Sequence, residues 1–134
     1  MRLIFVVTLL GIAGALVAVA ATPEEEASTI GQKWLSLLDD QKYEESWKLA
    51  GSTFRDQVKQ EQWVGALKRS RQPLGSLVSR AASRVQFAST LTGAPDAEYA
   101  IIHFATSLQN KTITERLELV KEDGKWQVFA YAIH

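Results

Sequence analysis

Glu115 is the acidic residue whose position could support chemistry. The strand pattern described below places it on the apolar face of a sheet, with Thr106 opposite it. A half-buried carboxylate there would have a raised pKa, and it could act as a general base or anchor a ligand. The alternative is that Glu115 lies at the rim of the sheet and meets water or an arginine. We favour this second interpretation, because structural ion pairs also place acids in such positions.

His103 and Arg71 are the other polar residues that could take part in a site. The same strand pattern pairs His103 with Glu118 on the opposite face, and such a pair could titrate near neutral pH or be a surface contact only. Arg71 could hold an anion, or it could tie the helices to the sheet by bonds to carbonyls or to Glu115, which we favour. The chain has no cysteine and only two histidines, far apart, so we expect no metal site and no cofactor.

Two sets of residues follow from these positions. The candidate pocket lies between helices and sheet and comprises Glu115, Thr106, Trp34, Tyr43, Trp47 and Arg71. The candidate interface lies on the outer sheet face and comprises His103, Arg116, Glu118, Phe129 and Tyr131. Aromatic side chains suit both, because they fill cores, line pockets and anchor interfaces.

Three consecutive strands position these residues: 98–108, 113–122 and 125–133. Asp123-Gly124 predicts a two-residue hairpin, which pairs Glu122 with Lys125 and Glu115 with Ala132. An even-length loop centred on Asn110-Lys111 places the alternating apolar residues of the first two strands on one face. The other face, which carries the candidate interface, is mixed.

Helices are predicted before the strands. Thr22-Pro23 followed by three glutamates is typical of a helix start, and the apolar stripe of this helix ends at Asp39-Asp40. Shorter helices are expected over 42–50, capped by Asp40, and from Ser52, with a break near residues 60–61. A turn over 72–75 ends this half. Residues 76–90 form a weak strand, in which Leu77, Ala81, Val85 and Phe87 share one face. This order predicts an α+β fold, with N-terminal helices packed on one face of a four-stranded antiparallel sheet.

The N-terminus predicts export. Arg2 precedes an apolar run, Leu3 to Ala21, that ends in small residues, which is typical of a signal peptide over residues 1–21 and leaves a single domain over 22–134. We therefore expect a periplasmic or secreted protein. An uncleaved inner-membrane anchor is the alternative, since the run approaches the roughly 20 residues of a spanning helix. Without Arg2 the chain has 14 basic and 15 acidic residues, which gives no reason to expect nucleic-acid binding.

Several short segments carry a resemblance to a known family. They are Trp34, Tyr43, Ser46-Trp47, Phe54, Trp63, Arg71 with Pro73-Leu74-Gly75, Gly93 to Asp96, Tyr99, Lys111 and Asp123 to Trp126. Together they resemble a family of short exported bacterial proteins catalogued as domain of unknown function 4019, which implies a bacterial envelope location and brings no reaction. The order of elements also resembles the cystatin-like superfold of ketosteroid isomerase.

Two classes of function remain open. The first, which we favour, is a non-catalytic binding or assembly module of the envelope that uses the outer sheet face for a homodimer or for a partner protein. The second is a small-ligand binder or minor enzyme that uses a cone-shaped cavity between helices and sheet. A polar cavity of a few hundred cubic ångströms that reaches Glu115 would favour the second class, and a filled core the first.

Overall fold

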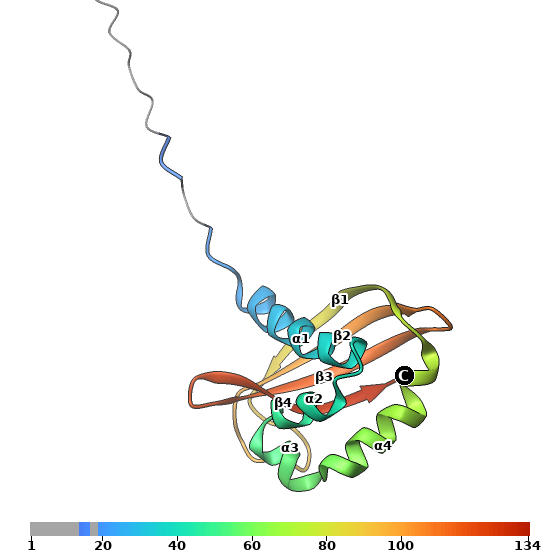
Figure 1. Cartoon of the computed structure of the whole chain (residues 1–134). Coiled ribbons are helices and arrows are strands. Elements are labelled where there is room, and N and C mark those ends of the chain that lie inside the picture. The colour runs from blue at the N-terminus through green and yellow to red at the C-terminus, as the bar shows by residue number, and fades with distance from the viewer. Residues whose placement is uncertain (1–13, 17–18) are drawn as a thin grey trace, which may run out of the picture.

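The computed structural model describes residues 14–16 and 19–134, and it forms an α+β domain with four helices and a four-stranded antiparallel sheet (Figure 1). The helices are α1 (Pro23–Asp39), α2 (Tyr43–Lys48), α3 (Ser52–Gln57) and α4 (Gln60–Ser70), followed by a single 3-10 turn, η1 (Gln72–Leu74). The strands are β1 (Leu77–Ala88), β2 (Tyr99–Leu108), β3 (Thr112–Glu122) and β4 (Lys125–Ile133). The predicted fold class is confirmed.

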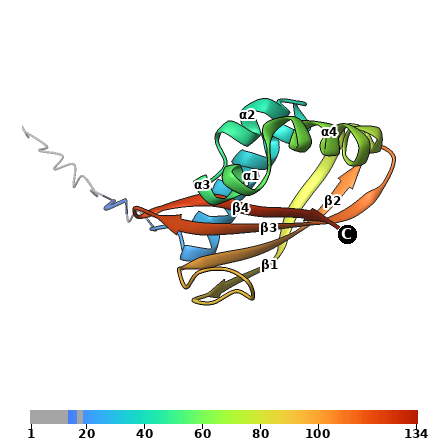
Figure 2. The same ribbon diagram turned by 90° about the horizontal axis from the view of Figure 1, so that it is seen from below.

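The sheet has the order β1-β2-β3-β4, so each strand pairs with the next one in the chain. Figure 2 shows α2, α3 and α4 on one side of the sheet, which we call the inner face, and the loop between β1 and β2 on the other, outer side. The phenol of Tyr99 donates a hydrogen bond of 2.5 Å to the carbonyl oxygen of Pro95 in this loop, and Tyr99 is buried. The loop therefore covers one end of the outer face.

The predicted hairpin is confirmed, because Asp123 and Gly124 both have positive φ angles, 50° and 75°. A two-residue turn with positive φ at both positions is the type that matches the twist of the flanking strands. Between β2 and β3 the register differs by two residues from the expected one: Phe104, not Thr106, pairs with Glu115, and His103 pairs with Arg116 instead of Glu118. A shift of two leaves every side chain on its predicted face.

A bulge in β4 overturns the prediction for the end of that strand. Leu119 pairs with Val128 as expected, but Glu118 pairs with Ala130 and Leu117 with Tyr131. The extra residue is Phe129, and it reverses the faces of the residues that follow. Tyr131 consequently lies on the inner face and not in the outer-face interface predicted for it.

Two register shifts in β1 change the faces that we had predicted for its residues. The register shifts between Leu77 and Ser79 and again between Ala82 and Arg84. Arg80 pairs with Thr106, an inner-face residue, so the predicted alternation fails in the first half of this strand. Val85 and Phe87, after the second shift, pair with the inner-face residues Ile102 and Ala100.

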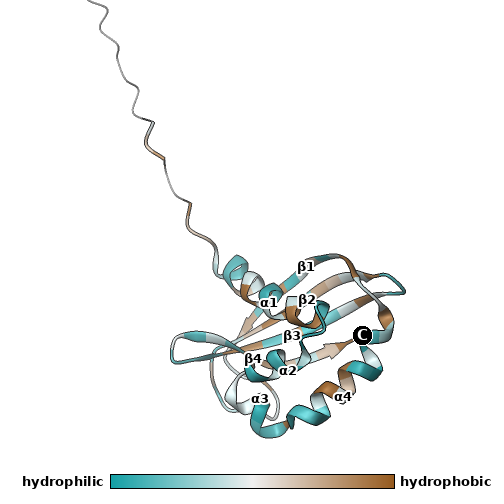
Figure 3. Cartoon of the chain, viewed as in Figure 1, coloured by the Kyte–Doolittle hydropathy of each residue, from teal (hydrophilic) through white to brown (hydrophobic). Residues whose placement is uncertain are grey.

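The core lies between α1 and the inner face of the sheet. At Gly31 an added Cβ would lie 3.0 Å from a methyl carbon of Leu117 and 3.2 Å from the Phe104 ring, so a larger residue would require these side chains to move by a few tenths of an ångström. In Figure 3 the tip of the β3–β4 hairpin is hydrophilic and the apolar colours gather in the strands behind the helices. The pattern agrees with the predicted burial of one sheet face.

The helix ends agree with the prediction in part. Thr22 caps α1 through a hydrogen bond of 3.2 Å from the amide of Glu25 to its hydroxyl oxygen. We had expected Asp40 to cap α2, and this was wrong. Asp40 is instead the residue at the C-terminal end of α1, and Lys42 precedes α2 without a side-chain cap. The predicted break falls at Val58 and Lys59, just before α4 begins.

The predicted signal peptide, 1–21, lies largely outside the described residues. Among the helices of residues 14–16 and 19–134, the structure has none of the length and apolar character that crossing a membrane requires.

Candidate functional site

Six side chains meet between the helices and the inner face of the sheet, and we call them the ionic cluster. Each comes from a different element: Asp39 from the end of α1, Arg71 from the end of α4, Arg80 from β1, Thr106 from β2, Glu115 from β3 and Tyr131 from β4. Two arginines and two carboxylates balance each other in formal charge. The cluster therefore connects the C-terminal ends of α1 and α4 to all four strands of the sheet.

Arg80 is the central cation of the ionic cluster. Its two terminal nitrogens lie 2.7 and 2.8 Å from the two carboxylate oxygens of Asp39, and its Nε donates to Oε1 of Glu115 at 2.9 Å. A planar guanidinium suits such two-sided binding. Burial by itself would lower the pKa of Arg80, and the hydrogen bonds and charges of Asp39 and Glu115 more than offset this, so that its pKa is raised.

Glu115 accepts hydrogen bonds on both carboxylate oxygens. The hydroxyl of Thr106 donates to Oε1 at 2.7 Å, and the phenol of Tyr131 donates to Oε2. Burial, followed by the charge and the hydrogen bond of Glu115, raises the pKa of Tyr131, so the phenol stays protonated and remains a donor. The β4 bulge is what brings this phenol to the carboxylate.

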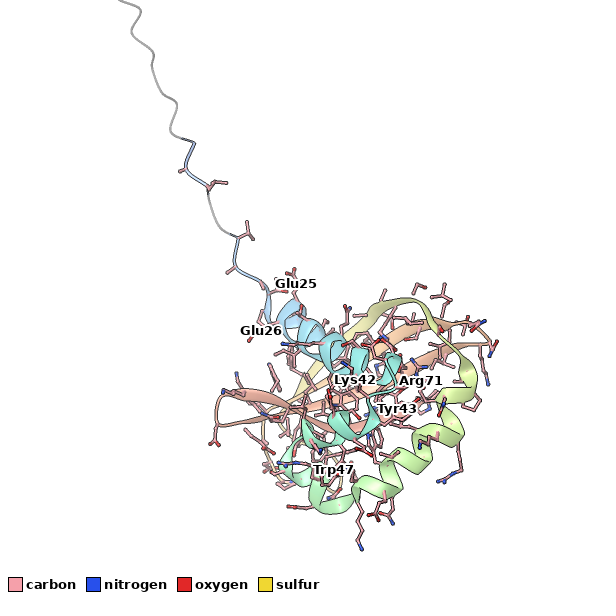
Figure 4. All side chains as sticks on the ribbon, viewed as in Figure 1. Glu25, Glu26, Lys42, Tyr43, Trp47 and Arg71 are labelled. Carbon is pink, nitrogen blue, oxygen red and sulfur yellow. The ribbon has the colours of Figure 1, made fainter. Side chains whose placement is uncertain are left out.

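Arg71 connects the helical layer to the same carboxylates. One terminal nitrogen lies 2.6 Å from Oδ1 of Asp39, whereas its Nε is 3.9 Å from Oε2 of Glu115 and has no hydrogen-bond partner. Figure 4 shows Arg71 at the end of α4, near Tyr43 at the start of α2. Arg71 therefore joins helices and sheet, which is the arrangement that we had favoured.

Three members of the ionic cluster, Glu115, Thr106 and Arg71, are closed to solvent, and the other three are partly exposed. The exposed fraction is 0% for Glu115 and Thr106 and 2% for Arg71. A side chain without accessible surface touches no cavity that could hold water. Two described surface hollows, of about 420 and 270 Å³, lie elsewhere, on either side of Trp126. Glu115 is thus neither at a rim nor at a cavity, and its two oxygens are already occupied.

The aromatic members of the candidate pocket are core residues held by hydrogen bonds to the backbone. The indole nitrogen of Trp34 donates to the carbonyl oxygen of Ser46 at 2.9 Å, and that of Trp47 donates to Val58 at 2.7 Å. Tyr43 is buried, and burial raises its pKa, an effect that nearby Arg71 opposes. These residues surround the filled core and line no common cavity with Glu115.

The outer face carries a second polar arrangement, which we call the cationic row: Arg84 of β1, His103 of β2 and Arg116 of β3. Arg84 pairs with His103, and His103 with Arg116, so the three side chains are direct neighbours across the sheet. Arg116 also donates to Glu118 at 2.8 and 3.1 Å. Within the described residues Arg84 is exposed and makes no salt bridge.

The pKa of His103 is lowered from its ordinary value. Partial burial lowers its pKa, and the positive charges of Arg116, Arg84 and His134 lower it further. The expected pairing with Glu118 is wrong, since that carboxylate lies beside Arg116. Arg84 is thus the member of the row that makes no salt bridge within the described residues, and the sequence alone did not indicate this arrangement.

The candidate interface is brought together only in part. His103, Arg116 and Glu118 lie on the outer face as predicted. Phe129 also does, but its ring packs on Tyr99, with centroids 5.3 Å apart. Tyr131 lies on the inner face, with its ring 5.9 Å from that of Trp34. The apolar half of the predicted interface is therefore used within the chain itself.

Three residues that matter here were missed by sequence reasoning. Arg80 and Arg84 were assigned to a weak strand, and the bulge between them turns one inward and the other outward. Asp39 was taken as a helix end only. A usable signal did exist for Asp39, because it follows Leu35 by four positions and so lies on the buried side of α1.

Comparison with protein families finds one match, to a protein family of unknown function (DUF4019), over residues 30–131. The match covers most of the chain, and the chain belongs to this family. A comparison with curated proteins found no match.

Proposed function

We propose that this member of the DUF4019 family is a non-catalytic binding module of the bacterial envelope, and that it binds an acidic partner through the cationic row. One observation carries the proposal: Arg84, an exposed cation of the outer face, makes no salt bridge within the described residues, whereas the inward-facing arginines are neutralised. Exposed charges of one sign steer and orient partners of the opposite sign.

The closed interior supports a binding role over catalysis. A general base needs a free oxygen within reach of a substrate. Both oxygens of Glu115 accept hydrogen bonds, and the residue has no accessible surface. The alternative of a small-ligand site in a cone-shaped cavity requires space at Glu115, and the filled core argues against it.

The location and the finer fold are part of the same proposal. The apolar run Leu3 to Ala21 supports export with a signal peptide over residues 1–21, and the mature domain over 22–134 then works in the periplasm or outside the cell. Helices followed by a four-stranded meander support a place in the cystatin-like superfold. Partner contact, whether with a second copy or another envelope protein, takes place on the outer face.

The test measures binding of a fluorescein-labelled peptide of ten glutamates to the mature protein by fluorescence anisotropy. We expect saturable binding that weakens with salt, and Arg84→Glu should weaken it about fivefold, because it replaces an attraction by a repulsion. Arg55→Glu is the matched control, since Arg55 is an exposed cation on α3 and the same charge change there should have little effect. Equal affinity of wild type and Arg84→Glu would refute the proposal.

A further inference from the structure

The strand β1 forms one free edge of the sheet. It is 12 residues long and pairs only with β2, and Figure 1 shows it at the border of the sheet. The opposite edge is covered at one point, because the amide of Gly51, before α3, donates to the carbonyl oxygen of Val128 in β4 at 2.9 Å. Within the described residues no backbone hydrogen bond is made to the edge of β1 that faces away from β2.

Edge strands present unpaired N–H and C=O groups, and proteins usually protect them with short length, proline, charged side chains or bulges. β1 is long and has no proline, lysine or acidic residue from Leu77 to Ala88; its protections are Arg80, Arg84 and two register shifts. Most of its residues are exposed, with Val78 at 70% and Phe87 at 44%. The strand is therefore open to pairing along most of its length.

The charge of this edge points to one kind of occupant. The guanidinium of Arg80 turns inward to Asp39 and Glu115, so Arg84 is the free cation of β1, and it stands on the outer face beside His103. An added strand would bring its own side chains next to Arg84, because residues on neighbouring strands lie about 5 Å apart.

We propose that β1 accepts an extended acidic segment of a partner protein as a fifth strand, with one carboxylate of the segment at Arg84. The inference rests on the proposed function and specifies the form of the partner. Backbone hydrogen bonds supply the affinity in this mode of recognition, and side-chain pockets and charges supply the selectivity. Because β1 contains no acidic residue, none of its side chains would repel the carboxylates of such a segment.

A second copy of the chain fits this edge less well. The twofold axis of an antiparallel pair stands perpendicular to the sheet, so both outer faces lie on the same side. The two Arg84 side chains would then lie on the same face, close to the interface between the copies, where their like charges repel. An acidic strand avoids this repulsion and gains an attraction.

The experiment compares three labelled ten-residue peptides by anisotropy: alternating valine and glutamate, the same peptide with an N-methyl group on every residue, and ten glutamates. The methylated peptide has no N–H donor on either edge, and decaglutamate lacks the strand-favouring valines, so only the first peptide combines free N–H groups with a preference for the extended conformation. We expect it to bind about tenfold tighter than the N-methylated peptide, because several backbone bonds are lost on methylation. Hydrogen exchange should show new protection of β1 amides with the first peptide only.

Charge reversal supplies the second arm. Arg84→Glu should bind the valine–glutamate peptide more weakly, and a valine–lysine peptide more tightly, than the wild type does. Arg55→Glu should bind both peptides as the wild type does. If the valine–glutamate and decaglutamate peptides bind equally and β1 amides gain no protection, strand addition is wrong and the proposed function stands. Failure of every acidic peptide to bind overturns both. A dimer of the protein alone that protects β1 amides assigns the edge to a second copy and refutes the inference.

Discussion

Removing Arg80 is the sharpest test of the ionic cluster. In Arg80→Met, Asp39 loses two hydrogen bonds and Glu115 loses one, and Arg71 is left as a single cation facing two carboxylates. Removing one partner of a buried ion pair costs about 3–5 kcal/mol. Since a domain of this size is stable by roughly 5–15 kcal/mol, the variant should lose a substantial part of its free energy of unfolding.

The assay is urea unfolding followed by tryptophan fluorescence and circular dichroism. The midpoint should fall in Arg80→Met while the slope stays the same, because the surface exposed on unfolding does not change. Arg84→Met is the matched control: it removes an exposed arginine from the same strand, and its stability should stay within about 0.5 kcal/mol of wild type.

Charge balance gives the test a second result. Glu115→Gln alone leaves two cations facing one carboxylate, but Arg80→Met with Glu115→Gln leaves Arg71 and Asp39 balanced. The double variant should therefore be more stable than the sum of the single effects predicts, by about 0.5–3 kcal/mol. Additive effects, or a cost below about 1 kcal/mol for Arg80→Met, would contradict the paired and buried cluster.

Three further outcomes are expected. Leu117→Asp should unfold the domain and Arg116→Asp should not, because neighbouring residues point to opposite faces and only Leu117 is fully buried; thermal melts that treat the two alike would exclude this register. The pKa of His103 is lowered on folding, so the unfolded chain binds more protons: stability should fall as pH drops from about 6.5 through the folded pKa, and His103→Gln should flatten this slope in urea titrations between pH 7.5 and 5. Mature protein from the envelope should begin at Ala21 or Thr22 by N-terminal sequencing, and an intact N-terminus in the membrane fraction would favour the anchor.

The sequence was most informative where local chemistry decides the structure. Asp123-Gly124 specified its turn, and the alternation of apolar residues in β2 and β3 specified their faces, because only one pairing parity buries a continuous apolar surface. The register error of two residues between these strands had no consequence for the faces. Glu115 was correctly placed on the inner face for the same reason.

The pattern could not reveal the bulges. Phe129 and Tyr131 have the same parity, and nothing in the residues 129–133 distinguishes a regular strand from one with an extra residue. In the structure, Tyr131 gains a carboxylate partner and a place between Trp34 and Trp63, and these tertiary contacts favour the bulge. The sequence therefore predicted the position of the central acid, Glu115. It did not predict that Arg80 and the phenol of Tyr131 would contact this acid.

The ionic cluster also constrains the order in which the chain acquires its structure. Its members are spread from Asp39 to Tyr131, so the cluster is complete only when β4, the last strand, has joined the sheet. Contacts that distant in sequence form slowly, because long loops must close first. Until β4 has joined the sheet, Glu115 lacks its phenol partner and the edge of β3 is exposed. Docking of β4 is thus the step that completes the ionic cluster.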